Sequence, residues 1–157
     1  MQQTAKWIYD FSHSKIGFSV RHFGISETDG FFRKFVGSAL SEKENFSDLQ
    51  VELNIDTNSI DTNDSQRDML ELISKDNYKM IGDLTIKGIT KTVVLNLEFA
   101  GIVPKDPFGN TKAGFFVSGK INRKDWDITW NAALDHGGIA VSETVKISCP
   151  IELLKAS

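Results

Sequence analysis

The chain has 157 residues, of which 40% are hydrophobic and 25% are charged, and its formal net charge is −3 at pH 7. This length suits one domain with its own hydrophobic core, so we take residues 1–157 as a single domain. A weakly acidic chain whose basic residues occur in pairs such as Arg33-Lys34 lacks the basic face of a nucleic-acid-binding protein, and no apolar run is long enough to span a membrane.

The first residues of the chain, Met1 to Lys6, contain no apolar stretch of the kind that forms the centre of a signal peptide. We therefore expect a cytoplasmic protein, or a periplasmic one if a signal peptide has been removed. Strand patterning begins directly afterwards.

The segment from Trp7 to His22 predicts the first strand. From Ile16 onward apolar and polar residues alternate, and Ile16, Phe18, Val20 and His22 share one face. Because successive side chains of a strand point to opposite faces, this alternation predicts a strand with one apolar side, which a histidine closes.

The same two-residue period recurs along the rest of the chain. A second strand follows the hairpin signal Asp29-Gly30. The predicted strands after this turn are 31–40, 49–55, 78–86, 92–100, 115–121, 126–130 and a segment around residue 147. About eight strands suffice to close a barrel that is filled by side chains or holds one small ligand. The prediction is an all-β, antiparallel barrel.

Two segments favour a helix of a turn or two. Residues 62–70 are rich in polar side chains, and Asp64 or Ser65 is suited to cap a helix there. Residues 130–136 form the second candidate. The fold class expected is therefore all-β with one or two short helices.

The last predicted strand contains Cys149, the only cysteine, so the chain can form no internal disulfide. Cys149 lies on the apolar side of an alternating segment that runs from Val145 to Leu153. This position indicates a buried structural thiol rather than a nucleophile, and the absence of disulfides fits a reducing compartment.

The histidines form no recognisable catalytic or metal-binding pattern. His13 and His22 are roughly 30 Å apart along an unbroken strand at about 3.3 Å per residue, which is too far to bind one metal ion. The sequence contains no HExxH, CxxC, GxSxG or P-loop motif. We therefore expect no enzymatic activity, no metal and no cofactor.

Phenylalanine is frequent, with eleven residues against two tyrosines. A core packed with phenylalanine explains this composition, and so does an apolar lumen that holds an extended ligand. Composition alone favours the packed core.

Several motifs, in order along nearly the whole chain, resemble the YceI family of polyisoprenoid-binding proteins. The most specific is the string G-D-L-T-I-K-G-I-T-K from Gly82 to Lys91. The others are W-x-x-D-x-x-H-S-x-I-x-F-x-V-x-H at 7–22, G-x-F-x-x-F-x-G at 30–37, S-I-D-T with R-D at 59–62 and 67–68, and N-R-K-D-W with W-N at 122–126 and 130–131.

The resemblance implies an extended, lipocalin-like antiparallel β-barrel whose lumen holds a long apolar chain, and family members are not established enzymes. We therefore expect this chain to bind a long-chain amphiphilic lipid, such as an isoprenoid quinone, a polyprenyl phosphate or a fatty amide, for storage, transport or stress protection. The candidates for the polar head group are His22 and Arg67, followed by Arg123. The candidates that line the lumen are Ile16, Phe18, Val20, Phe32, Phe35, Leu53, Leu84, Ile86, Leu97, Phe99, Phe115, Val117, Trp126 and Trp130.

The alternative function is a scaffold or stress-response protein without a ligand, whose barrel is filled by its own side chains. An enzyme that acts on a lipid or quinone would need clustered histidine and carboxylate groups, and the sequence offers no such cluster.

The chain departs from the family pattern at one place. Family members continue the Arg-Asp pair with His-Leu, a D-F-F segment and a strand ending in F-x-S, whereas here Met69 runs directly into Leu70. We therefore expect a missing wall segment near 69–70. Such a deletion would leave an unpaired strand edge, which a second copy would cover in a homodimer.

Overall fold

The structure is a computed structural model that describes residues 4–56, 63–74, 76–135 and 137–156, with the backbone alone described at 63–74. These residues form ten strands and one short 3-10 helix. Their bounds are β1 Ala5–Tyr9, β2 Ile16–His22, β3 Ser26–Phe32, β4 Phe35–Ser41, β5 Gln50–Asp56, β6 Asn63–Ser74, β7 Asn77–Ile86, β8 Ile89–Val103, β9 Lys112–Asn122, η1 Arg123–Trp126 and β10 Val141–Lys155.

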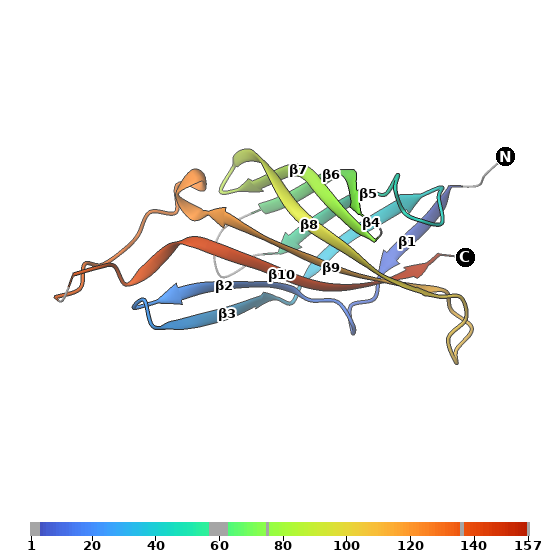
Figure 1. Cartoon of the computed structure of the whole chain (residues 1–157), viewed down its shortest axis with the longest axis horizontal. Coiled ribbons are helices and arrows are strands. Elements are labelled where there is room, and N and C mark those ends of the chain that lie inside the picture. Colours follow the sequence, from blue (N-terminus) through green and yellow to red (C-terminus); the bar gives the residue numbers. More distant parts are fainter. Residues whose placement is uncertain (1–3, 57–62, 75, 136, 157) are drawn as a thin grey trace.

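All strands belong to one antiparallel sheet, with the order β1-β4-β5-β6-β7-β8-β9-β10-β2-β3. The sheet curls until its first strand meets its eighth, because β1 pairs with β10 as well as with β4 (Figure 1). Trp7 lies opposite Lys155 and Tyr9 opposite Leu153 at this closure. The all-β antiparallel fold predicted from the alternation is thus confirmed.

Ten strands are present where about eight were expected, because two predicted strands are each interrupted and β6 forms where a helix was predicted. The predicted strand 126–130 is wrong, because Trp126 ends η1 and residues 127–130 form no strand. The segment 7–22 forms β1 and then β2, which follow one another along the same edge of β10. Pro150 of β10 lies opposite the interruption and has no N–H to donate, although its carbonyl oxygen accepts a hydrogen bond from the Lys15 amide at 2.9 Å. The segment 31–40 is likewise divided at Arg33-Lys34 into β3 and β4.

The curled sheet is a half-barrel form of the antiparallel β-barrel that we expected. Among the described strands, β3 pairs only with β2, so its other edge has no strand neighbour. The wall is therefore closed where β1 meets β10 and open beside β3. Figure 1 shows the β2–β3 hairpin and η1 at the end of the molecule opposite the two chain termini.

Both helix predictions are wrong for the residues that the structure describes. Residues 63–70 belong to β6, which pairs with β5 and β7, and residues 130–135 form no helix. Capping residues such as Asp64 and Ser65 favour a helix only weakly, and pairing on both sides of a strand outweighs this local preference. The observed helix, η1, begins after Asn122, whose side chain accepts a hydrogen bond from the Lys124 amide.

The position of the expected deletion lies inside β6. Met69 pairs with Ile81 and Leu70 pairs with Met80, so the backbone on the β7 side is continuous there. On the β5 side, pairing ends at Arg67, so residues 68–74 of β6 have no described strand partner there, and β3 has a second unpaired edge. The shortened segment after Met69, relative to the family pattern, stays a prediction.

Aromatic side chains close the end of the half-barrel near the termini. The Phe46 ring contacts the rings of Trp7, Phe99 and Phe115 at centroid distances of 5.1, 5.2 and 5.2 Å. Phe46 comes from the loop between β4 and β5 and is 1% exposed. Such ring contacts each contribute roughly 0.5–1.5 kcal/mol beyond the burial of their area. The cluster is therefore a solid plug, and space for a ligand lies only beyond it.

Candidate ligand cavity

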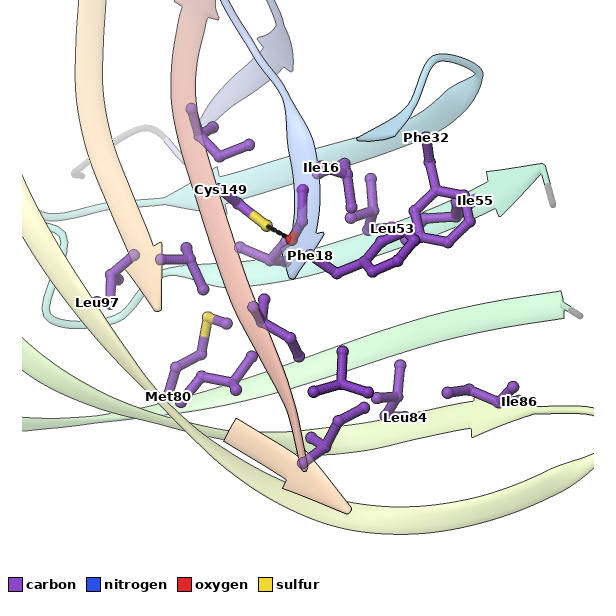
Figure 2. Close-up of a pocket in the computed structure, with 18 of the residues that line it drawn as sticks. Ile16, Phe18, Phe32, Leu53, Ile55, Met80, Leu84, Ile86, Leu97 and Cys149 are labelled. Carbon is purple, nitrogen blue, oxygen red and sulfur yellow. Dashed lines mark hydrogen bonds between the residues drawn. The ribbon is translucent and has the colours of Figure 1, made fainter. Parts of the chain in front are cut away.

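The inner face of the curled sheet encloses a cavity of about 310 Å³ (Figure 2). This volume lies at the lower end of the range found for ligand sites, roughly 300–1,000 Å³. Its lining is almost entirely aliphatic and aromatic, and Arg123 is the only charged residue on it among the side chains that the structure describes. Apart from this guanidinium, the cavity is suited to an apolar molecule.

The cavity is elongated, because one strand lines it along nearly its whole length. On β10 the lining runs from Val141 to Leu153, and the side chains between them face inward at alternate positions. Twelve steps at about 3.3 Å give ~40 Å of strand, and a strand tilt of roughly 40° reduces this to ~30 Å along the axis. That length equals the thickness of the hydrocarbon core of a bilayer, ~30 Å. The shape fits a long chain better than a compact molecule.

The two ends of the cavity differ in solvent exposure. Toward the aromatic plug, Leu97 and Leu153 are 4% and 2% exposed. Toward η1, Val20, Ile128 and Val141 line the cavity but are only partly buried. The cavity therefore has a closed end at the plug and a mouth between the β2–β3 hairpin and η1.

Most of the residues predicted for the lumen line this cavity. Alternation along each strand sends them to the inner face, as the sequence analysis expected. The lumen candidates that line it are Ile16, Phe18, Val20, Phe32, Leu53, Leu84, Ile86, Leu97, Phe115 and Val117.

Four other lumen candidates lie elsewhere. Phe35 packs against Tyr9 and Phe11, with ring centroids 5.8 and 5.1 Å away, and Phe99 belongs to the aromatic plug. Trp126, the last residue of η1, is 2% exposed and donates from Nε1 to the Leu84 carbonyl at 3.0 Å, whereas Trp130 is 70% exposed. The first three pack against other parts of the protein, and Trp130 follows η1 in a loop.

Of the first two head-group candidates, His22 does not line the cavity, and Arg67 is not tested. The ring of His22 lies against the ring of Phe23, with centroids 3.7 Å apart, at the end of β2. The side chain of Arg67 lies outside the described residues. The third candidate, Arg123, is therefore the one that the structure places at the cavity.

A large part of the cavity lining was not predicted from the sequence. The inward positions of β10 were recognised as apolar but were not proposed as ligand contacts, although their alternation was the same signal that identified the other strands. The missed lining residues are Tyr9, Gly17, Leu49, Val51, Ile55, Met80, Leu95, Ile121, Ile128, Val141, Val145, Ile147, Cys149, Ile151 and Leu153.

Arg123 is 6% exposed, the first residue of η1 and a residue of the mouth. Its Nε donates to the Ser142 carbonyl at 2.9 Å, Nη1 to Ile128 at 2.6 Å and Nη2 to Val141 at 3.3 Å. These acceptors are neutral, and no carboxylate of the described residues forms an ion pair with Arg123. Since a guanidinium has five N–H donors, two remain beyond these three bonds. A buried cation with donors to spare attracts an oxygen-rich or anionic group.

Cys149 lines the middle of the cavity and is 5% exposed, as predicted for a structural thiol. Its Sγ lies 3.9 Å from the Gly17 carbonyl oxygen. Burial raises the pKa of the Cys149 thiol to about 11, because desolvation penalises the thiolate. The group therefore contributes apolar lining and no nucleophile near neutral pH.

Phe18 reaches the cavity across a glycine. Phe18 and Gly30 pair directly between β2 and β3, and a Cβ at Gly30 would lie 2.2 Å from the Phe18 ring. The ring also lies 5.4 Å from that of Phe32. The hairpin signal Asp29-Gly30 of the sequence therefore has another role: it lies within β3, and its glycine makes room for Phe18.

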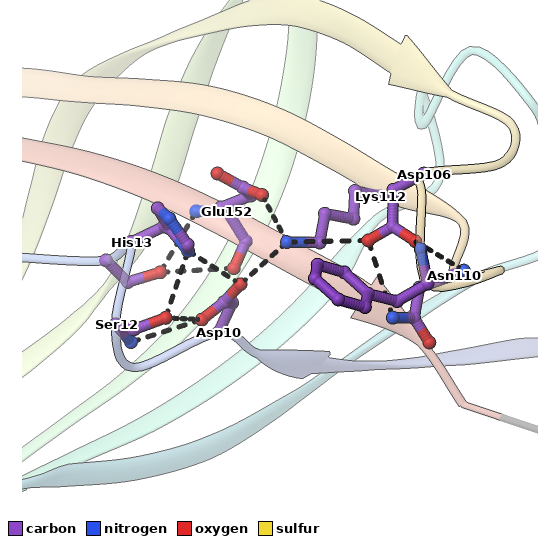
Figure 3. Close-up of polar contacts among 9 residues, drawn as sticks. Asp10, Ser12, His13, Asp106, Asn110, Lys112 and Glu152 are labelled. Carbon is purple, nitrogen blue, oxygen red and sulfur yellow. Dashed lines mark hydrogen bonds and ion pairs between the residues drawn. The ribbon is translucent and has the colours of Figure 1, made fainter.

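A polar network lies toward the closed end, outside the cavity (Figure 3). The Lys112 ammonium lies 3.0 Å from a carboxylate oxygen of both Asp10 and Glu152, and the Asp10 carboxylate is also 3.0 Å from His13 Nδ1. Asp10, His13 and Glu152 could otherwise gather around a metal ion, because their ligand atoms lie within 4.8 Å of one another. The lysine already supplies the positive charge there, so we interpret this network as a structural tie between the β1–β2 connection, β9 and β10.

The described part of the chain contains no helix with the length and apolar character needed to cross a membrane.

Comparison with known proteins gives one family and a consistent fold. Residues 7–77 and 69–153 match the model of the YceI-like domain. The UPF0312 proteins SA2479 and MW2606 of Staphylococcus aureus, strains N315 and MW2, are each 30% identical to this chain over 161 residues, which cover 92% of this chain and 94% of the relative. Their names state neither a ligand nor an activity.

Solved structures of the same fold come from other bacteria. Burkholderia cenocepacia BcnA superposes with a TM-score of 0.74 at 17% identity, over 92% of this chain and 98% of BcnA. A polyisoprenoid-binding domain from Saccharophagus degradans superposes with a TM-score of 0.63 at 11% identity, over 96% of this chain and 98% of that domain. At these identities the likeness establishes the shared fold.

Proposed function

Because the chain belongs to the YceI-like domain family, we propose that it binds one long-chain amphiphilic lipid in its cavity. The observation that carries the proposal is the elongated apolar cavity with one buried charge at its mouth. The chain of the lipid lies along β10 toward Leu153, and its polar head lies at Arg123. Burial of the chain drives binding, at about 25 cal/mol per Å² of apolar surface removed from water.

Isoprenoids come first among the ligands to test. The domain of the same fold from Saccharophagus degradans is a polyisoprenoid-binding domain. The lipid tails of one bilayer leaflet span about 15 Å, which is half of the hydrocarbon core. A cavity ~30 Å long therefore suits a longer chain than such a tail. Fatty amides and fatty acids remain in the same class, because the lining distinguishes apolar chains by length more than by branching. Holding such a molecule serves its storage, its transport or protection under stress.

The alternative, a half-barrel filled by its own side chains, requires a dense interior. Protein interiors have a packing density near 0.74–0.76, with few voids larger than a water molecule. A cavity of about 310 Å³ in the centre of the sheet is difficult to reconcile with such packing and favours an occupant.

Native mass spectrometry of freshly purified protein, followed by solvent extraction and lipid analysis, tests the proposal. We expect one co-purified isoprenoid or fatty molecule per chain, or uptake of added ubiquinone or fatty amide by empty protein. A protein that is empty and also rejects both added lipids would favour the alternative.

A matched pair of substitutions locates the ligand. Phe18→Asp introduces a charge into the cavity lining, whereas Phe31→Asp makes the same change at a side chain on β3 that is 55% exposed. We expect Phe18→Asp to lose the lipid and Phe31→Asp to retain it, with folding of both checked by circular dichroism. Equal lipid content in both variants would show that the cavity is not the site.

The role of Arg123 in holding the head group is tested by comparing ligands that share a chain but differ in the head, such as a fatty acid and the corresponding alcohol. Arg123→Lys keeps the positive charge, and Arg123→Gln removes it. We expect wild type and Arg123→Lys to prefer the acid and Arg123→Gln to lose this preference. An unchanged acid-to-alcohol ratio in Arg123→Gln would remove Arg123 from the head-group site.

A further inference from the structure

The mouth end of the molecule exposes large apolar side chains on two loops, which we call the mouth loops: residues 22–26, and residues 128–135 with 137–140. Ile25 is 88% exposed and Phe23 48% on the first loop, and Trp130 is 70% and Ile139 44% exposed on the second. A hydrogen bond of 2.8 Å from the Phe23 amide to the Ala140 carbonyl joins the loops. Figure 1 shows both at the same end, with the second extending beyond the strands. They therefore form one apolar surface beside the cavity mouth.

The first mouth loop holds an aromatic side chain at a strained backbone position. Phe23 has φ 52° and Gly24 has φ 72°, and the Ile25 amide donates to the His22 carbonyl at 3.2 Å, as in a type I′ hairpin turn. Asparagine or aspartate is the usual residue at the first central position, and a bulky residue with positive φ is an outlier. The half-exposed Phe23 ring contacts the His22 ring and fills no core. Strain of this kind is characteristic of functional positions.

The mouth loops carry almost no charge. Residues 23–26 contain no Asp, Glu, Lys or Arg, and residues 128–142 contain only Asp135. The nearest lysine beside the second loop, Lys124, already pairs with Glu143 at 2.6 Å. The described residues of the mouth loops include no lysine or arginine with which to attract a nucleic acid or an acidic partner. Tryptophan, phenylalanine and isoleucine without charge are the composition that enters the interfacial layer of a lipid bilayer.

We propose that the mouth loops insert into the surface of a lipid bilayer and place the cavity mouth against the membrane. This inference rests on the proposed lipid-binding function, because a chain that lies along the cavity must pass through the mouth. With Trp130 and Ile25 in the interfacial layer, the chain moves between bilayer and cavity without crossing water. The continuity of the apolar loops with the apolar cavity is the reason to choose a bilayer rather than a second copy of the chain.

Flotation of the full chain with phosphatidylcholine vesicles tests the docking. The double variant Ile25→Ser/Trp130→Ser removes the two most exposed apolar side chains of the mouth loops. Phe108→Ser is the matched control, because Phe108 is 89% exposed on the β8–β9 loop at the opposite end. We expect wild type and Phe108→Ser to float equally, and the double variant to partition at least about tenfold more weakly. Raising the salt from about 0.1 M to about 1 M should not release the wild type.

Tryptophan fluorescence identifies the inserted group. Of the three tryptophans, Trp7 and Trp126 are 5% and 2% exposed, so a brominated phosphatidylcholine quenches chiefly Trp130. We expect quenching in wild type and none in Trp130→Phe. Three results would each overturn the proposal. The wild type floats without quenching, the double variant floats as well as the wild type, or the wild type does not float at all. The proposal would also be overturned if light scattering showed that the wild type is a dimer and the double variant a monomer, because a second copy of the chain would then cover the mouth loops.

Lipid content separates this inference from the proposed function. Wild type that carries lipid but does not float loses the docking and keeps the lipid-binding function. Wild type that floats with quenching but neither carries nor accepts lipid keeps the docking and loses the lipid-binding function. If both hold, we expect the double variant to bind as much lipid at equilibrium as wild type and to exchange it with vesicles at least about tenfold more slowly.

Discussion

A tryptophan placed halfway along the cavity should shorten the lipid chain that the protein can bind. Ile147 lies on β10, six residues from Val141 at the mouth and six from Leu153 at the closed end, and its side chain lines the cavity. The cavity is ~30 Å long, so Ile147→Trp leaves ~15 Å on the mouth side. The added side chain occupies existing space, which limits the overpacking that would otherwise cost about 1–3 kcal/mol.

The size of the effect follows from the burial of methylene groups. Each buried methylene contributes about 0.8 kcal/mol, or roughly fourfold in Kd. In wild type the affinity should rise with each added carbon until the chain meets the plug. In Ile147→Trp the rise should stop at about half that length, and a ligand whose last four methylenes lie beyond the tryptophan should bind about 3 kcal/mol more weakly, more than a hundredfold.

Displacement of a fluorescent fatty-acid probe by fatty acids of increasing length measures this dependence. Ser148→Trp is the control, because Ser148 is the neighbouring residue on β10 and its side chain is exposed on the outer face. We expect Ser148→Trp to reproduce the wild-type dependence on chain length. If Ile147→Trp also reproduces it, the chain does not lie along β10 and the assignment of the cavity as the binding site is refuted.

Two further predictions concern titratable groups. Because burial raises the pKa of Cys149 to about 11, its alkylation by iodoacetamide should accelerate about tenfold per pH unit from pH 8 to pH 10, and a plateau below pH 9 would contradict this. The unfolded chain releases this proton at lower pH than the folded one, so stability should fall as pH rises between about 9 and 11. Burial, the largest influence on Asp10, raises its pKa, but hydrogen bonds from Ser12, Lys112 and His13 outweigh burial and hold the pKa well below its usual range. Asp10→Asn should therefore lower the free energy of urea unfolding by about 1–3 kcal/mol at pH 7, with a loss that shrinks as pH falls below about 4, whereas Asp125→Asn, at an exposed residue of η1, should change little.

Strand alternation predicted the inner face of the sheet well, because it depends only on local sequence. Phe18, Leu84 and Leu97 face the cavity for the same reason that they alternate with polar neighbours. The period of two assigns each residue to a face regardless of where its strand pairs. The amino-acid sequence alone therefore suffices to predict this part of the site.

The position of an inward side chain along the axis of the half-barrel could not be predicted from the alternation. Phe35 and Phe99 lie on inward positions, yet they pack against protein, because strand register places Phe35 beside Tyr9 and Phe99 beside Phe46 in the plug. Phe46 reaches this cluster from a loop, with φ 57°, and carries no alternation signal. Whether an inward side chain meets ligand or protein depends on contacts between segments that are distant in sequence.

The sequence pattern was least informative about which charged residues line the cavity. A basic residue next to another, as in Arg123-Lys124, has the pattern of a solvated surface, and Lys124 indeed pairs with Glu143 in the exposed layer. Arg123 turns inward because η1 begins at this residue and because the carbonyls of Ile128, Val141 and Ser142 accept its hydrogen bonds. Ile128 follows η1 within a segment that was predicted as a strand, and Val141 and Ser142 begin β10, so the alternation pattern alone could not show that these carbonyls meet at Arg123.

The position of Arg123 and the exposure of the mouth loops lead to a common mechanism. A head group held by Arg123 stays at the boundary between cavity and solvent, so the chain must enter the cavity first, from the mouth. The plug around Phe46 blocks the other end, and the β3 edge leaves the wall open near the mouth. A lipid can therefore enter and leave without opening the closed end, where Lys112 ties β9 to β10 and to the β1–β2 connection. Weakening that tie by Asp10→Asn should accordingly lower stability and leave the rate of lipid exchange unchanged; faster exchange in this variant would show that lipid also passes through the closed end.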